Sequence, residues 1–222
     1  MQCIESWKKY FPDFVIKEWN EKSFDVNALV YTKEAYAAGK YAFVSDVARL
    51  HALVNEGGIY FDTDVTVLKR FPQELFDYSA FAGFEMDKFI GTAVLASEPS
   101  HIFFKEMLND YKNRHFNLFL KNDTTSNVTK ITNALVSLGL IQNNTKQSIA
   151  NILVLPQSAF CNKNYETQEY YTSGESLAIH DFSGSWSKSS SIGRIWKLLH
   201  LPQTNICNKI AKILRKLSTT SN

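Results

Sequence analysis

The chain has 222 residues, of which 45% are hydrophobic and 14% aromatic, and its formal net charge is +2. This length and apolar content allow a sizeable buried core, which excludes a disordered protein. We recognise neither a secretory signal nor the run of roughly 18 apolar residues that a membrane span needs. The three cysteines, Cys3, Cys161 and Cys207, lack the spacing of a disulfide or zinc framework, so we expect free thiols in the reducing cytoplasm.

Helical and strand patterns alternate in the first part of the chain. The apolar spacing, with its Gly and Pro breaks, predicts a helix over residues 3–10, a strand over 14–19, a helix over 31–38, a helix over 43–54 and a strand over 59–61. Gly57 and Gly58 end the fourth of these elements, because glycine accepts the positive φ of a helix C-terminus.

The alternation continues to residue 180. It predicts strands over 65–68, 80–84, 90–96, 152–155 and 177–180, and helices over 128–138 and over 100–119, the latter capped by Ser100. Because strands and helices alternate, we predict an α/β fold, with one domain over residues 1–187. Serine-rich residues 187–191 lead into a tail, residues 188–222, with basic amphipathic helices at 192–200 and 205–217.

Two aspartates separated by one residue, Asp62 and Asp64, follow directly after the strand at 59–61. A strand that opens into such a turn places both carboxylates at the edge of a sheet, where open α/β folds bind ligands. Paired carboxylates can share a hard divalent cation, and Mg²⁺ or Mn²⁺ then completes its shell with water and substrate phosphates. A polar turn after a strand is the alternative interpretation, and the motif is too short to exclude it.

Asp46 and Arg49 lie three residues apart, on one side of the helix that precedes this strand. They could bind a substrate together, or form a surface ion pair worth a few tenths of a kcal/mol. His180 stands at the end of the last predicted strand and is followed by Trp186. Each of these two residues could equally be structural.

The pattern S-D-x-x-R, followed by G-G-I-Y-x-D-x-D, spans Ser45 to Asp64 and resembles glycosyltransferase family 32, the DXD sugar-binding family. This family includes capsular polysaccharide enzymes and fungal initiating mannosyltransferases. The resemblance extends in weaker form to CIESWKKYFPDFVIKEWNE and to IHDFSGSW. It implies a GT-A-type, Rossmann-like fold with a mixed, mostly parallel sheet flanked by helices. The implied activity is retaining, metal-dependent transfer of a sugar from a nucleotide-sugar donor to a glycan or lipid-linked acceptor in capsular polysaccharide synthesis.

The resemblance also implies roles for individual residues. Asp64 would be the main ligand of Mn²⁺ or Mg²⁺, and Asp62 would approach the metal and the ribose. Asp46 and Arg49 would hold hydroxyls of the donor sugar. The remaining positions that the resemblance places at the metal or the substrate are Thr92, His180, Ser185 and Trp186. Tyr60 could line the site or be a residue of the core or sheet face. No Asp/Glu pair in the sequence makes a convincing double-displacement nucleophile, so we expect same-face attack without a covalent enzyme intermediate.

Family members usually begin with a strand of the form I-P-K-I-I-H-x-x-W, which this sequence lacks. Its loss would expose a sheet edge and weaken nucleotide binding. The alternative function is therefore a catalytically impaired or truncated member that acts as a binding or scaffold partner in glycan assembly.

The tail carries apolar residues on one helical face, surrounded by basic residues, namely Lys209, Lys212, Arg215 and Lys216. Such a helix can bind an anionic membrane surface, which would place the protein peripherally at the inner membrane face, or it can pack on the domain. No basic–aromatic motif indicates nucleic-acid binding.

Overall fold

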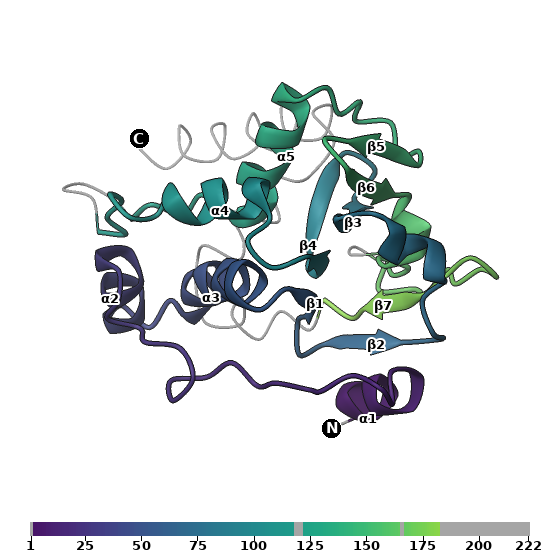
Figure 1. Ribbon diagram of the computed structural model, residues 1–222, viewed down its shortest axis with the longest axis horizontal. Coiled ribbons are helices and arrows are strands. Elements are labelled where there is room, and N and C mark those ends of the chain that lie inside the picture. Colours follow the sequence, from purple (N-terminus) through teal and green to yellow (C-terminus); the bar gives the residue numbers. More distant parts are fainter. Residues whose placement is uncertain (1, 118–121, 165–166, 183–222) are drawn as a thin grey trace, which may run out of the picture. The chain divides into compact units, whose positions relative to one another are not determined.

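The computed structural model describes residues 2–117, 122–164 and 167–182, which belong to one compact unit (Figure 1). Its α-helices are α1 (Gln2–Tyr10), α2 (Val30–Ala37), α3 (Tyr41–Asn55), α4 (Ile102–Asn109) and α5 (Asn127–Ser137). Its strands are β1 (Gly58–Phe61), β2 (Val65–Val67), β3 (Ala80–Glu85), β4 (Phe89–Ser97), β5 (Gln147–Ile149), β6 (Ile152–Leu155) and β7 (Ala178–His180). Two short 3₁₀ helices, η1 (Gln73–Asp77) and η2 (Gln157–Ala159), complete the described elements. The α/β class is thus confirmed.

The main sheet has five strands in the order β1-β4-β3-β6-β5, and β2 pairs with β7 in a second, smaller sheet. Within these sheets of the described chain, β3 and β6 run parallel and every other pair is antiparallel. The main sheet is mixed, as predicted. The prediction that it is mostly parallel is wrong for the described strands.

The turn between β3 and β4 explains this error. Met86 and Asp87 both have positive φ angles, 49° and 62°, which is the backbone of a tight hairpin turn that joins antiparallel strands. Such turns normally carry Asn-Gly or Asp-Gly, so the sequence Glu-Met-Asp-Lys at 85–88 gives no hairpin signal. Both strands are also buried on both faces, a pattern typical of parallel strands.

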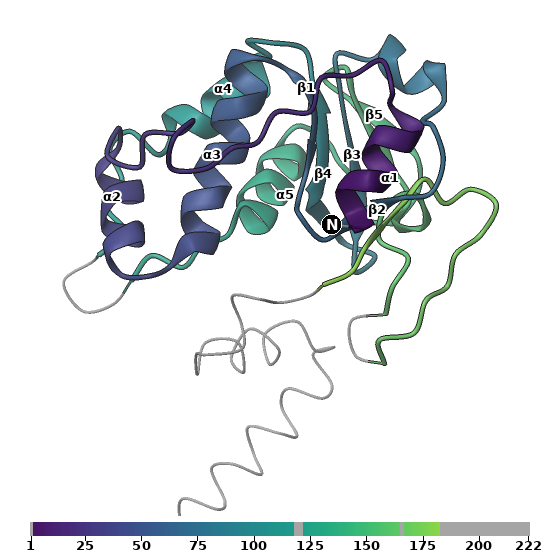
Figure 2. The same ribbon diagram turned by 90° about the horizontal axis from the view of Figure 1, so that it is seen from below.

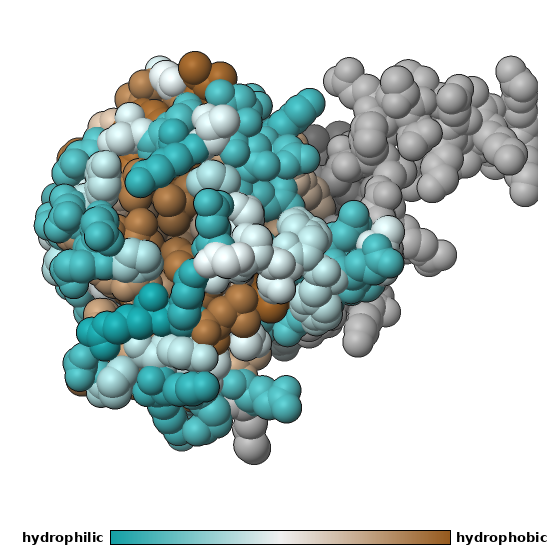
Figure 3. Space-filling model, turned by 90° about the vertical axis from the view of Figure 1, so that its right-hand side faces the viewer, coloured by the Kyte–Doolittle hydropathy of each residue, from teal (hydrophilic) through white to brown (hydrophobic). Residues whose placement is uncertain are grey.

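The two faces of the main sheet support two separate apolar clusters. Figure 2 shows α3, α4 and α5 on one side of the sheet and α1 with β2 on the other. Along β4, Leu95 packs into the cluster under the helices, whereas Val94 and Ala96 pack into the cluster beneath α1 and β2. On the face drawn in Figure 3, apolar side chains reach the surface only in narrow patches between hydrophilic ones. No helix of the described residues is long and apolar enough to cross a bilayer.

Helix α3 ends where the sequence predicts, and its end fixes the start of β1. Gly57 and Gly58 adopt φ angles of +68° and +87°. A Cβ on Gly57 would lie 2.6 Å from Cδ of Pro99 and 2.8 Å from the carbonyl oxygen of Ser97. Only glycine therefore allows the chain to pass this close to the end of β4, which begins its pairing with β1 at Gly58 and Ser97.

Two predicted elements differ from the structure. Residues 14–19 form no strand, because they pair with no neighbour in the described chain, and Val15 is 95% exposed. The predicted helix over 100–119 is reduced to α4, which ends at Asn109 before a series of turns. Ser100 does not cap it: its φ angle is +59°, and His101 occupies the N-cap position. The helices predicted at 192–200 and 205–217 lie outside the described residues.

Candidate functional site

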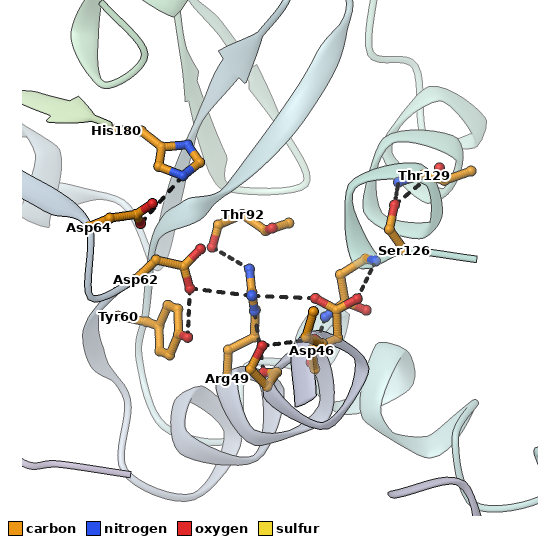
Figure 4. Close-up of polar contacts among 12 residues, drawn as sticks. Asp46, Arg49, Tyr60, Asp62, Asp64, Thr92, Ser126, Thr129 and His180 are labelled. Carbon is orange, nitrogen blue, oxygen red and sulfur yellow. Dashed lines mark hydrogen bonds and ion pairs between the residues drawn. The ribbon is translucent and has the colours of Figure 1, made fainter. Parts of the chain in front are cut away.

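Asp62 and Asp64 lie in the turn that connects β1 of the main sheet to β2 of the small sheet (Figure 4). We call residues 62–64 the DXD turn. The backbone NH of Asp62 donates to the carbonyl of Ala93 at 2.9 Å, and the NH of Val65 donates to the carbonyl of Asp62 at 3.1 Å. The two aspartate side chains keep 25% and 21% of their surface exposed. They are held in position and remain accessible.

The pairing of β7 with β2 brings His180 to the DXD turn, from more than 100 residues further along the chain. His180 stands opposite Val65 in the strand register, and the NH of Asp181 donates to the carbonyl of Asp64 at 3.0 Å. Nε2 of His180 lies 3.5 Å from Oδ1 of Asp64. One ligand atom from each of Asp62, Asp64 and His180 falls within 4.8 Å of the other two.

Asp46 and Arg49 are buried, with 7% and 5% of their surface exposed. The interpretation of this pair as a surface ion pair is therefore wrong. Nη2 of Arg49 lies 3.4 Å from Oδ1 of Asp46 and 3.3 Å from Oδ1 of Asp62, so one guanidinium joins both carboxylates. Burial alone would lower the pKa of Arg49, but the carboxylates of Asp62 and Asp46 raise it above its ordinary value.

Asp46 is also held by the N-terminus of α5. The NH of Asn127 donates to Oδ2 of Asp46 at 3.0 Å, and the Asn127 side-chain amide donates to the Asp46 carbonyl at 2.6 Å. Ser126 caps this helix by accepting from the NH of Thr129. A helix N-terminus favours a carboxylate, yet burial still raises the pKa of Asp46 above its ordinary value. The role of Asn127 was not predictable from the sequence, because a capping pattern does not reveal which distant side chain the helix end contacts.

Tyr60 and Thr92 contact the same group of residues. The Tyr60 hydroxyl donates to Oδ1 of Asp62 at 2.8 Å, and the Arg49 guanidinium lies over the Tyr60 ring, 5.1 Å from its centroid. Thr92 takes part through its backbone, whose carbonyl accepts from Nη1 of Arg49 at 2.8 Å. The structure thus brings together seven of the nine predicted site residues. Ser185 and Trp186 lie outside the described residues.

The segment that contains α3 and the DXD turn is also the part of the chain that resembles known proteins. Residues 1–82 match the glycosyltransferase sugar-binding region that contains the DXD motif. This match confirms, over residues 1–82, the resemblance seen in the sequence, and a region of this kind is associated with sugar transfer. No curated protein and no solved structure matches the chain. Thr92 and His180 lie beyond the matched segment, so their assignment to the site rests on their position beside it.

The donor atoms of the DXD region fit a divalent cation. Oδ1 of Asp62 is occupied by Arg49 and Tyr60, which leaves Oδ2 as the oxygen of this residue that can bind a metal. Carboxylate oxygens suit Mg²⁺ and Mn²⁺. The imidazole of His180 is a nitrogen ligand, which first-row transition metals such as Mn²⁺ accept more readily than Mg²⁺.

Proposed function

We propose that the protein is a retaining glycosyltransferase with a GT-A-type fold, which moves a sugar from a nucleotide-sugar donor to a glycan or lipid-linked acceptor. Asp62, Asp64 and His180 hold the Mn²⁺ or Mg²⁺ that this reaction uses. The observation that carries the proposal is the convergence of these three side chains within 4.8 Å, beside a region whose family implies sugar transfer. Their partial exposure leaves them accessible to a donor.

A bound cation at the DXD turn neutralises, as a Lewis acid, the negative charge that develops on the departing nucleoside diphosphate. The protein supplies the geometry. Arg49 and Tyr60 both contact Oδ1 of Asp62, so they orient this carboxylate before the donor arrives. Contacts that orient a ligand in this way commonly contribute 10-fold to 100-fold in metal affinity.

Asp46 and Arg49 contribute to the binding of the donor sugar. Their ion pair joins α3 to the DXD turn, so a sugar hydroxyl that contacts either side chain is fixed relative to the metal. Fixing the anomeric carbon against the acceptor lowers the entropic part of the barrier. Both side chains are nearly buried. We therefore propose that the sugar hydroxyl contacts this ion pair on the side that faces Asp62.

For the chemical step we propose same-face attack of the acceptor, without a covalent enzyme intermediate. Asp62 and Asp64 are committed to the metal in this account, and Asp46 is committed to Arg49 and Asn127. None of the three is then available as a nucleophile. The acceptor belongs to a cell-surface glycan, such as capsular polysaccharide, and the tail at 188–222 attaches the protein to the anionic inner face of the membrane.

A panel of nucleotide sugars tests the proposal. Thermal unfolding with Mn²⁺ first identifies the donor, because a ligand at 100 times its Kd stabilises the folded state by about 2.7 kcal/mol. NMR of the sugar released from that donor then gives the anomeric configuration, and we expect it to match the configuration of the donor. An inverted product contradicts the retaining mechanism. If no donor is bound or turned over, the alternative of an impaired binding or scaffold protein replaces the enzyme.

A further inference from the structure

A second cluster of metal-binding side chains lies next to the DXD turn. Glu85 is the last residue of β3, Cys161 follows η2, and His180 is the last residue of β7. The parallel pairing of β3 with β6 and the bond from the NH of His180 to the carbonyl of Phe160, at 3.1 Å, bring these chain ends together. One ligand atom from each of the three residues lies within 4.8 Å of the other two.

Two of the three side chains of this cluster are fully buried, and the third carries a buried nitrogen without a hydrogen-bond partner among the described residues. Glu85 is 4% exposed and Cys161 is 3% exposed. Among the described residues, Nδ1 of His180 is buried without a hydrogen-bond partner, and Cys161 is a free cysteine. Burying a carboxylate without a partner is costly, and buried charges in proteins are normally paired or bound to a metal. A cation held by the three side chains would give Nδ1 of His180 a partner and would neutralise the buried carboxylate.

The backbone of a glycine lies close against this cluster. Gly91 of β4 faces it, and a Cβ at this position would lie 3.0 Å from Oε2 of Glu85 and 3.5 Å from Sγ of Cys161. Any larger residue at this position would crowd the Glu85 side chain. The backbone of Cys161 is held in place, because the hydroxyl of Tyr171 donates to its carbonyl at 2.8 Å.

The chemistry of the three ligands selects the kind of cation. Thiolate sulfur is a soft ligand that Mg²⁺ and Ca²⁺ avoid, whereas a thiolate, an imidazole and a carboxylate together suit Zn²⁺ or Co²⁺. Three protein ligands leave a fourth position open for water. We propose that Glu85, Cys161 and His180 form a second metal site, distinct from the DXD turn, which takes a thiophilic divalent cation such as Zn²⁺.

The two sites share His180. A cation at the second site therefore competes with the metal at the DXD turn for this ligand. If the function proposed above holds, Zn²⁺ at the second site lowers the rate of sugar transfer with Mn²⁺. This consequence rests on the proposed function, whereas the binding of the cation does not.

Cobalt(II) is the probe for the test. The full chain is freed of metal, kept reduced and titrated with Co²⁺ in the presence of excess Mg²⁺, while the near-ultraviolet absorption of a thiolate-to-cobalt bond is recorded. We expect this band to saturate near one equivalent, to disappear in Cys161→Ser and to persist in the matched control Cys3→Ser. Zn²⁺ should displace it. Absence of the band in the wild type, or its persistence in Cys161→Ser, overturns the proposal.

Two more variants keep the result clear if Cys161→Ser folds poorly. Glu85→Gln removes a ligand and keeps the thiol, so we expect the band at a Co²⁺ affinity at least about tenfold weaker. Asp64→Ala removes a ligand of the DXD turn alone and should keep both the band and its affinity. An unchanged affinity in Glu85→Gln contradicts the site. Failure of sugar transfer with the band intact contradicts only the proposed function.

Discussion

Arg49 of helix α3 reaches the DXD turn, where its Nη2 lies 3.3 Å from Oδ1 of Asp62. The same nitrogen lies 3.4 Å from Asp46, one turn earlier in the helix. One buried cation thus ties the helix to the loop that carries the proposed metal ligands. The loop geometry therefore depends on the position of the helix, and the stability of both depends on Arg49.

Replacing Arg49 should destabilise the fold strongly. Arg49→Ala leaves Asp46 buried beside no cation, and breaking a buried ion pair costs about 3–5 kcal/mol. Arg70→Ala is the matched control, because Arg70 pairs with Asp13 on the surface, with side chains 55% and 69% exposed. We expect it to cost about 0–1 kcal/mol. Urea unfolding of both variants measures the difference, and equal losses would contradict the structural role of the buried pair.

Tyr60→Phe should weaken metal binding more than it weakens the fold. The change removes the hydroxyl that donates to Oδ1 of Asp62 and keeps the ring under Arg49. We expect a loss of about 1 kcal/mol in the free energy of unfolding and about 10-fold to 100-fold in Mn²⁺ affinity. Calorimetric titration with Mn²⁺ gives the affinity. Tyr41→Phe, at an exposed tyrosine, is the control and should bind Mn²⁺ as the wild type does.

Gly57 and Gly39 allow a clean comparison of backbone strain with steric clash. Both have φ angles near +68°, so alanine at either position should cost about 1–2 kcal/mol for a left-handed backbone. Only at Gly57 does the new Cβ meet Pro99 and the Ser97 carbonyl below 3.0 Å, whereas nothing lies within 4 Å at Gly39. We expect Gly57→Ala to be the more costly by a further 1–3 kcal/mol, roughly the cost of overpacking. Denaturant unfolding checks this difference, and equal costs would refute the close approach.

Asp123, which precedes α5, should make the free energy of unfolding depend on pH in the acidic range. Burial alone would raise the pKa of Asp123, but hydrogen bonds from Arg114 and from Thr125 lower it below its ordinary value. A carboxyl whose folded pKa is depressed contributes stability above its unfolded pKa, and that contribution is lost as pH falls through the folded pKa. The loss in unfolding free energy of Asp123→Asn should therefore be on the order of 1 kcal/mol at pH 7 after solvent screening.

This loss should shrink below about pH 4, near the ordinary pKa of an aspartate. Asp13→Asn, at the exposed pair with Arg70, should show a smaller loss at pH 7 because solvent screens that pair more fully. Unfolding free energies at several pH values give both curves. A loss for Asp123→Asn that stays constant down to pH 3 would contradict the ion pair between Asp123 and Arg114.

The local elements around the site could be predicted because their signals are local. The apolar spacing of α3, its Gly-Gly end and the strand before the aspartates all lie within residues 41–64 and are all found. The family match falls on the same part of the chain. Gly57 shows why the signal is strong, since its φ angle and its contact with Pro99 exclude every other residue type.

Contacts between distant segments could not be predicted in the same way. Nothing in the sequence near Asp46 indicates that Asn127 binds it, and nothing near Glu85 indicates that Cys161 and His180 lie beside it. The antiparallel β3–β4 hairpin was missed because Met86 and Asp87 occupy positions that usually carry glycine. Each of these features depends on tertiary packing, which a single sequence does not encode in any local pattern.

The central claim is that Asp62 and Asp64 hold the metal that sugar transfer requires. The most direct test measures turnover of the identified nucleotide sugar as Mn²⁺ is titrated, in the wild type, in Asp64→Ala and in Asp13→Ala, whose carboxylate is exposed and paired with Arg70. We predict saturable Mn²⁺ dependence in the wild type and in Asp13→Ala, and a loss of turnover of at least about 100-fold in Asp64→Ala. Turnover in Asp64→Ala at the wild-type rate and with the same Mn²⁺ dependence would contradict the account.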